Sequence, residues 1–223
     1  MSRQDFRWKP LKKHAGPPQV FLGPLGGEPS AARFSGGAHF ALAGAPDFLH
    51  PWLSDSGSLT ARIVARCQQF QVRVLGETRA LPCVDERQLI GLPPGRHAWT
   101  REVLLLADGV PVVFAHSVLA PRDLIGAWHM AQAIGSRPLG AALFADPSIC
   151  RGPLSAARLA PGHPLHRHAC AALGESLPTL WARRSRFCRL DRPLLVTEVF
   201  LPGIEQLEWP PRSQPRLAAP TGG

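Results

Sequence analysis

The hydrophobic pattern of the chain is clearest near its C-terminus, where residues 193–202 run Pro-Leu-Leu-Val-Thr-Glu-Val-Phe-Leu-Pro. Apolar and β-branched residues bounded by proline at both ends predict a strand. Alternate side chains of a strand point to opposite faces, so Glu198 should share a face with Leu194 and Phe200. A buried carboxylate needs a partner, so Glu198 either pairs with a cation or lies at an exposed edge.

A second pair of strands is predicted to form a hairpin over residues 97–119. Its two apolar runs are separated by Asp108-Gly109, and both of these residues tolerate the positive φ that a tight turn requires. Arg101 then interrupts an apolar face, and a two-residue turn places it opposite His116. The alternative is that Arg101 extends along an amphipathic strand towards solvent.

A second hairpin is predicted to lead into the strand at 193–202. Residues 181–189 are joined to that strand by a short turn around Leu190 and Asp191. The resulting register places Arg183 or Arg184 across from Glu198, which would supply the cation that a buried carboxylate needs.

The remaining pattern predicts short helices and one further strand. A helix is expected over 47–53, another over 58–66 capped by Ser56 or Ser58, a strand over 69–75 ending near Gly76, a helix over 121–134 ending at Gly135, and a short helical piece from 141. Residues 146–178 contain many Pro, Gly and Ala and are expected to be loop and broken helix.

Strands joined by hairpins, with helices between the groups of strands, predict an α+β fold with a single mainly antiparallel β-sheet. A length of 223 residues suits one domain with extensions. We expect a largely irregular, Gly/Pro-rich and basic N-terminal extension over 1–45, a folded domain over 46–202, and a Pro-rich disordered tail over 203–223.

The net charge of +9 invites a nucleic-acid partner, but its distribution argues against one. All three lysines fall within the first thirteen residues, and elsewhere arginine is the only strong base. There is no basic strand interleaved with aromatic residues, so the charge favours anionic ligands without specifying nucleic acid. No run of eighteen apolar residues and no signal peptide is present, so we expect no membrane segment.

The five cysteines are scattered without a Cys-x-x-Cys pair, which favours a reducing cytoplasm over a disulfide framework or zinc site. His163, His166 and His168 lie near Cys170 in a Pro-rich stretch. They lack standard ligand spacing and acidic neighbours, so we expect them to be exposed to solvent and to hold no metal.

Four motifs occur in one order along the chain: Trp-Thr-Arg-Glu-Val-Leu-Leu followed by Ala-Asp-Gly at 99–109, Arg-Pro-Leu-Gly-x-x-Leu-Phe at 137–144, Trp-x-Arg-Arg-Ser at 181–185, and Leu-Leu-Val-Thr-Glu-Val-Phe-Leu-Pro at 194–202. Together they resemble the chorismate pyruvate-lyase family, and the resemblance runs from about Trp52 to Pro202. It implies a single antiparallel sheet with helical flaps over a buried ligand site. The implied activity is the conversion of chorismate to 4-hydroxybenzoate and pyruvate, the first committed step of ubiquinone biosynthesis, with no cofactor.

The same resemblance implies the site residues. Arg101 and Glu198 fall on the catalytic positions, and Leu59 and Leu139 fall on further substrate-binding positions. His116 stands where family members often carry arginine; together with Arg183 and Arg184 it would support the site from behind.

Chemistry suggests how these residues would act. The planar guanidinium of Arg101 can donate two parallel hydrogen bonds to a carboxylate. Glu198 can accept a hydrogen bond from the ring hydroxyl that the product retains. Glu198 could instead remove the adjacent ring proton, but we favour the holding role because that proton can move within the substrate. Leu59 and Leu139 would supply backbone N–H groups and a hydrophobic lid.

One other reading of the resemblance remains. Effector-binding domains of some bacterial transcription regulators are expected to share this fold without catalysis, and in those chains a DNA-binding domain stands ahead of it. The Gly/Pro-rich residues 1–45 do not suit such a domain.

We expect a monomeric enzyme in the cytoplasm whose partner is the small molecule chorismate.

Overall fold

The computed structural model of the protein describes residues 34–36 and 44–207. Its described strands form one antiparallel sheet in the order β1-β6-β7-β8-β4-β3-β2, and the short β5 pairs with β7 outside that order. The strands are β1 (Ser35–Gly36), β2 (Phe70–Ala80), β3 (Ala98–Ala107), β4 (Val110–Leu119), β5 (Cys150–Arg151), β6 (Ser155–Leu159), β7 (Leu180–Arg189) and β8 (Arg192–Phe200). The predicted α+β fold with a single mainly antiparallel sheet is confirmed.

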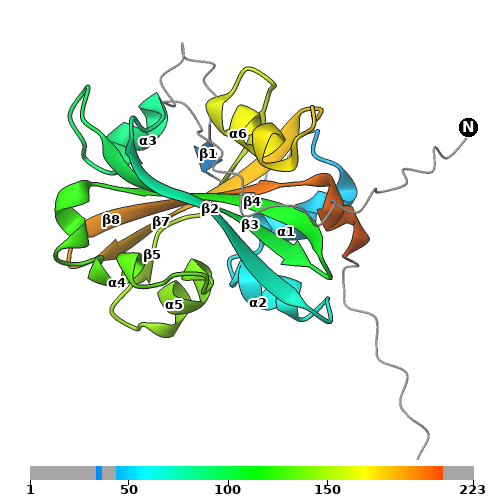
Figure 1. The fold of residues 1–223 in the computed structure, drawn as a ribbon, viewed down its shortest axis with the longest axis horizontal. Helices are drawn as coiled ribbons and strands as arrows, with labels where there is room; N and C mark the ends of the chain where they lie inside the picture. Colours follow the sequence, from blue (N-terminus) through cyan, green and yellow to red (C-terminus); the bar gives the residue numbers. More distant parts are fainter. Residues whose placement is uncertain (1–33, 37–43, 208–223) are drawn as a thin grey trace, which may run out of the picture.

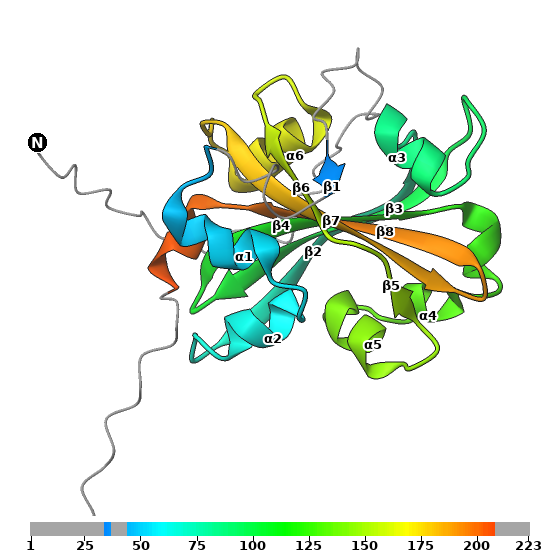
Figure 2. The ribbon, with the colours of Figure 1, turned by 180° about the vertical axis from the view of Figure 1, so that it is seen from behind.

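Helices cover both faces of this sheet. The 3-10 helices are η1 (Asp47–Leu49), η2 (Pro121–Leu124) and η3 (Pro202–Gln206), and the α-helices are α1 (His50–Ser54), α2 (Leu59–Val64), α3 (Val84–Leu89), α4 (His129–Gln132), α5 (Leu139–Ala145) and α6 (Pro164–Leu173). In Figures 1 and 2, α3 and α6 lie on one side of the sheet, whereas α2, α4 and α5 lie on the other.

Strand alternation divides the core between these two sides. Val103 and Leu105 of β3 pack in one cluster with residues of α1 and α2, including Trp52 and Ile63. Their neighbours in β3, Leu104 and Leu106, pack with α6 instead. Every residue of β3 is buried, so the centre of the sheet has no face open to water.

The β3–β4 hairpin forms as predicted, but its register is shifted by one residue beyond the turn. Leu105 pairs with Val113 and Leu106 with Pro111, which leaves Val112 as an extra residue in β4. Proline has no N–H to donate to the ladder, so an irregularity beside Pro111 is physically reasonable. As a result Arg101 pairs with Ser117, and the predicted position of His116 opposite Arg101 was wrong.

The second predicted register is confirmed in one of its two forms. Arg183 pairs with Glu198 across β7 and β8, and Arg184 pairs with Thr197 on the opposite face. Asp191 adopts a positive φ of 57° in the tight turn between these strands. A short polar residue tolerates that conformation better than most, which helps to set the register.

Several expected elements differ from the structure. The helix over 121–134 is replaced by η2 and the four-residue α4, with Gly126 between them, and glycine is a poor helix former. The strand at 69–75 continues past Gly76 to Ala80 after a bulge at Leu75. Residues 146–178 contain β5, β6 and the ten-residue α6, so the expectation of loop and broken helix was wrong there.

The folded body also extends beyond the predicted boundary at residue 202. η3 follows β8, and its Ile204 is buried in the cluster that contains α1 and α2. Residues 203–207 are therefore part of the folded domain, and residues 208–223, where the rest of the expected tail falls, lie outside the described part of the chain, as do residues 1–33 and 37–43. Within the expected extension, β1 pairs with β6.

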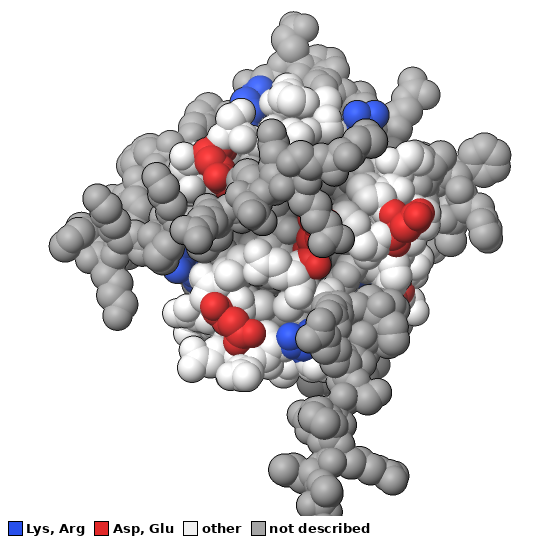
Figure 3. All heavy atoms as spheres, turned by 90° about the vertical axis from the view of Figure 1, so that its right-hand side faces the viewer, with Lys and Arg blue, Asp and Glu red and all other residues white. Residues whose placement is uncertain are grey.

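The charged side chains of the described residues do not gather into one basic patch on the face shown in Figure 3. In Figure 3 acidic and basic side chains are scattered among uncharged residues on the face in view. No helix in the described ranges is long and apolar enough to span a membrane.

Candidate active site

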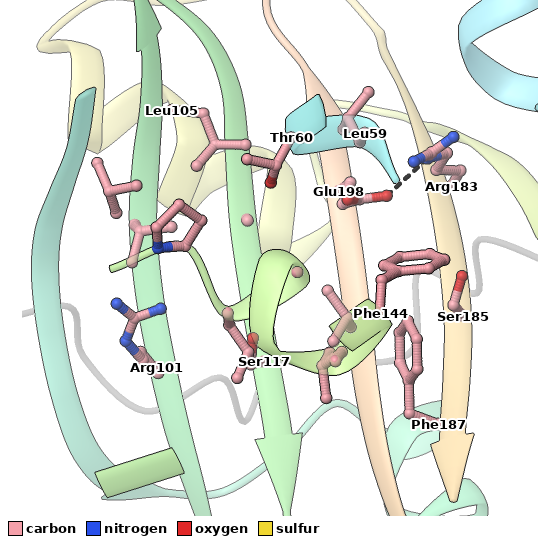
Figure 4. A pocket seen from close by; sticks show the side chains of 18 of the residues that line it. Leu59, Thr60, Arg101, Leu105, Ser117, Phe144, Arg183, Ser185, Phe187 and Glu198 are labelled. Atoms are coloured by element: carbon pink, nitrogen blue, oxygen red, sulfur yellow. Dashed lines mark hydrogen bonds and ion pairs between the residues drawn. The ribbon is translucent and has the colours of Figure 1, made fainter. Parts of the chain in front are cut away.

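A small buried pocket lies on the side of the sheet that α2 and α5 cover (Figure 4). Its cavity volume is about 40 Å³. Apolar walls come from Val72, Val103, Leu105, Leu143, Phe144 and Phe187. Polar groups come from Arg101, Ser117, Arg151, Arg183, Ser185 and Glu198. Arg101, Glu198, Leu59 and Leu139, which the sequence singled out, all line this one space.

Arg101 is held at one end of the pocket by a carboxylate and a backbone carbonyl. Its Nε donates to Glu77 Oε1 at 2.9 Å, and one Nη donates to the carbonyl of Gly135 at 2.7 Å. The bulge at Leu75 brings Glu77 opposite Arg101 across β2 and β3. Burial lowers the pKa of Arg101, and Glu77 opposes that shift. An arginine does not lose its proton at neutral pH, so a fixed positive charge faces the pocket.

Glu198 lies at the other end and is fixed by Arg183. Glu198 Oε2 accepts from Arg183 Nε at 2.6 Å. Arg183 also donates to the carbonyls of Trp52 and Asp55, both at 2.9 Å, which joins the sheet to the end of α1. Because Oε1 of Glu198 accepts no hydrogen bond from the described residues, it can accept one from a ligand.

Leu59 and Leu139 are the first residues of α2 and α5. Ser58 caps α2 as predicted, accepting from the N–H of Ala61 at 3.3 Å. A Cβ on Gly140 would come within 3.2 Å of Thr60 Oγ1, so the two helices approach closely at this point. The two leucines thus lie where two chain segments meet over the pocket.

His116 and Arg184 lie behind the site, on the opposite face of the sheet. His116 Nδ1 is 3.0 Å from Glu102 Oε1, and His116 Nε2 is 3.5 Å from Glu86 Oε2. Arg184 donates to Thr197 Oγ1 at 2.9 Å and to Glu86 Oε1 at 3.3 Å. Neither residue lines the pocket, so they support it only through the strands.

Charges in this buried network stabilise one another. Burial disfavours the charge on Glu86, but His116 and Arg184 outweigh it and lower the pKa of Glu86 to about 2. Burial likewise disfavours the charge on His116, but Glu86 and Glu102 raise its pKa to about 10. His116 is therefore a cation at neutral pH.

The expected exposure of three histidines was wrong. His163, His166 and His168 are all buried, because the segment expected to be a loop forms α6, which packs against the sheet. Each has its own role. His163 caps α6 at Leu165, His166 contacts the carbonyl of Pro178 at 2.8 Å, and His168 Nδ1 contacts Glu102 Oε1 at 2.7 Å.

The family model described as chorismate lyase matches residues 41–207, which is most of the chain and the whole of its larger described segment up to Leu207. The chain belongs to the chorismate lyase family. The resemblance in the four motifs is thereby confirmed.

Curated members of this family are closely similar to the chain. A protein of Aromatoleum aromaticum named probable chorismate pyruvate-lyase is 57% identical over 164 residues, covering 73% of this chain and 89% of that protein. One of Nitrosomonas europaea with the same name is 44% identical over 169 residues, covering 76% and 95%. Among solved structures, the PhnF C-terminal domain covers 66% of this chain and 91% of its own at 12% identity, with a TM-score of 0.48, which is too weak to bear on function.

Some pocket residues of this family member were not found from the sequence. Arg151 belongs to β5, within the segment expected to be loop. Ser185 lies in the Trp-x-Arg-Arg-Ser motif, two residues from Arg183. Alternation along that strand could have placed it beside Arg183 in the pocket. Ser117 was missed because the predicted register of the hairpin was wrong by one residue, and the structure pairs Ser117 with Arg101.

Proposed function

We propose that this protein is a chorismate lyase that converts chorismate to 4-hydroxybenzoate and pyruvate. The observation that carries the proposal is the arrangement of Arg101 and Glu198 at opposite ends of one buried pocket (Figure 4). The ring carboxylate and the ring hydroxyl of chorismate are para to each other, so one cation and one hydrogen-bond acceptor at opposite ends match them. Family membership supports the same reaction.

The chemistry asks the protein mainly to hold a reactive conformer. The C3–O bond breaks, the hydrogen on C4 moves to the methylene carbon of the enolpyruvyl group, and the ring becomes aromatic. These atoms form a six-membered cyclic arrangement, so the hydrogen can move within the substrate. A buried site that fixes both ends supplies the positioning and a preorganised electrostatic environment. Aromatisation drives the reaction, so we propose that no cofactor is needed.

Arg101 and Glu198 have separate roles in this scheme. Arg101 would donate to the ring carboxylate, an interaction strengthened by the low dielectric of the interior. Glu198 would accept from the C4 hydroxyl through Oε1, while Arg183 holds Oε2. The product keeps both groups and would bind at the same positions. We further propose that this product enters ubiquinone biosynthesis and that the enzyme acts in the cytoplasm.

The deciding experiment is to incubate the full chain with chorismate and follow both products. We expect 4-hydroxybenzoate, detected by its absorbance, and pyruvate, detected with lactate dehydrogenase, in equal amounts without added metal and with chelator present. Binding of 4-hydroxybenzoate by calorimetry without any turnover of chorismate would contradict the proposal. It would favour a non-catalytic domain that binds a small-molecule effector.

A further inference from the structure

Three guanidinium groups line the pocket, and they differ in how their charge is balanced. Arg101 is paired with Glu77, and Arg183 is paired with Glu198. Arg151 instead donates to neutral oxygens, the hydroxyl of Ser185 and the carbonyl of Ser56. Within residues 34–36 and 44–207 it has no carboxylate within ion-pair distance. Of the three pocket arginines, Arg151 is therefore the one whose charge a bound anion could balance directly.

Arg151 is also held in a fixed position. Its Nε and one Nη donate to Ser185 Oγ at 2.9 and 2.6 Å. The guanidinium carbon lies 5.3 Å from the ring centre of Phe144 and 5.6 Å from that of Phe187. These two rings meet edge to face with their centres 5.9 Å apart. Two aromatic contacts and two hydrogen bonds fix the plane of the group before any ligand arrives.

The surroundings of Arg151 are short of negative charge. Burial lowers the pKa of its guanidinium, and the nearby positive charge of Arg183 lowers it further, whereas Glu198 opposes the shift only in part. An anion bound here would relieve the repulsion between two arginines. Such contacts between an anion and a preorganised guanidinium are among the stronger polar interactions in proteins.

We propose that Arg151 binds the enolpyruvyl carboxylate of chorismate, the second carboxylate of this dianion. This inference rests on the proposed function and on the orientation in which Arg101 binds the ring carboxylate and Glu198 the C4 hydroxyl. The enolpyruvyl ether is on C3, next to that hydroxyl, so its carboxylate must lie on the Glu198 side. Figure 4 shows Ser185, Phe144 and Phe187, the partners of Arg151, on that side and away from Arg101.

The consequence concerns discrimination between substrate and product. Chorismate would bind through Arg101 and Arg151, whereas 4-hydroxybenzoate has lost the enolpyruvyl carboxylate and would bind through Arg101 alone. Arg151 would therefore hold the substrate and give nothing to the aromatic product, which favours its release.

The test compares substrate and product in Arg151→Gln and Arg151→Lys. We expect KM for chorismate to rise at least tenfold in the glutamine variant, as for loss of a charge-assisted hydrogen bond worth about 1.5–3 kcal/mol, while Kd for 4-hydroxybenzoate by calorimetry changes less than about twofold. The lysine variant keeps the charge but not the planar fork, so its KM should lie between the two. Arg158→Gln, which alters an exposed arginine of β6, should change neither quantity.

Other outcomes overturn the inference about Arg151, the proposed function, or both. An unchanged KM in Arg151→Gln would exclude the contact. Equal losses of substrate and product affinity would show that Arg151 only maintains the shape of the pocket. If the unaltered protein binds chorismate without converting it, the proposed function fails. Dissociation constants for chorismate then replace KM and the comparison with 4-hydroxybenzoate still decides the role of Arg151. If chorismate does not bind at all, both proposals fail.

Discussion

Replacement of Glu86 by glutamine tests the buried network behind the site. Glu86 is fully buried, and its two oxygens face different donors. Oε2 accepts from the N–H of Cys83 at 3.0 Å and faces His116, whereas Oε1 accepts from Arg184. A glutamine amide has one oxygen and one NH₂ group, so in either orientation the NH₂ must face a donor.

The size of the effect follows from the charges left behind. Breaking a buried ion pair by removing one partner costs about 3–5 kcal/mol. Arg184 keeps Asp85 and His116 keeps Glu102, so we expect the lower end, about 3 kcal/mol. For a domain of this size that corresponds to a fall in Tm of roughly 6–12 °C.

The loss should depend on pH in a defined way. The pKa of Glu86 is lowered from 4.5 to about 2, so its contribution is present above pH 4.5 and is lost as the pH falls towards 2. The pKa of His116 is raised from 6.5 to about 10, so its contribution is present below pH 6.5 and is lost as the pH rises through 10. The difference between the natural protein and Glu86→Gln should therefore be largest between pH 4.5 and 6.5.

Urea unfolding followed by tryptophan fluorescence at pH 3, 5.5 and 8.5 measures this difference. Glu175→Gln, at an exposed position, is the matched control and should match the natural protein at all three values. A loss of less than about 1 kcal/mol for Glu86→Gln at pH 5.5, or an equal loss at pH 3 and pH 5.5, would contradict a stabilising role for the Glu86 charge.

Three further substitutions test the site and its frame. Arg101→Ala should weaken binding of 4-hydroxybenzoate by at least a few kcal/mol in calorimetry, and unchanged affinity would exclude the pocket as the ligand site. Glu198→Gln with near-normal kcat would rule out a role as base, whereas a large loss is compatible with either role. Gly203→Ala should lower Tm by several degrees in a thermal melt, because its Cβ would collide with the carbonyl of Pro111; Gly126→Ala, where no atom lies within 4 Å, should not.

The parts of the site that sequence could predict are those that depend on local geometry. Alternation placed Arg101 and Glu198 on apolar faces, and the tight turn before Arg192 gave Glu198 its partner Arg183. Both inferences need only the period of a strand and the length of a turn. Such predictions hold only up to the first β-bulge, because a bulge shifts the pairing of all residues beyond it.

The errors arose where tertiary packing decides the outcome. One extra residue, Val112, moved His116 to the other face, and a bulge of that kind leaves little trace in the hydrophobic pattern. The burial of His168 depends on Glu102, which is 66 residues away in the chain. The position of Arg151 likewise depends on Ser185, through a two-residue strand that is too short to show a period.

The bulge at Leu75 has a consequence for the edge of the sheet. β2 is the last strand in the described order, so one row of its backbone groups has no partner strand among the described residues. Such an edge can accept a strand from another molecule. The bulge that brings Glu77 against Arg101 also breaks the even spacing of these groups, and the exposed Arg73 and Arg79 place charge beside any added strand. One irregularity thus orients Arg101, the residue proposed to bind the ring carboxylate, and makes edge-to-edge aggregation of the protein less favourable.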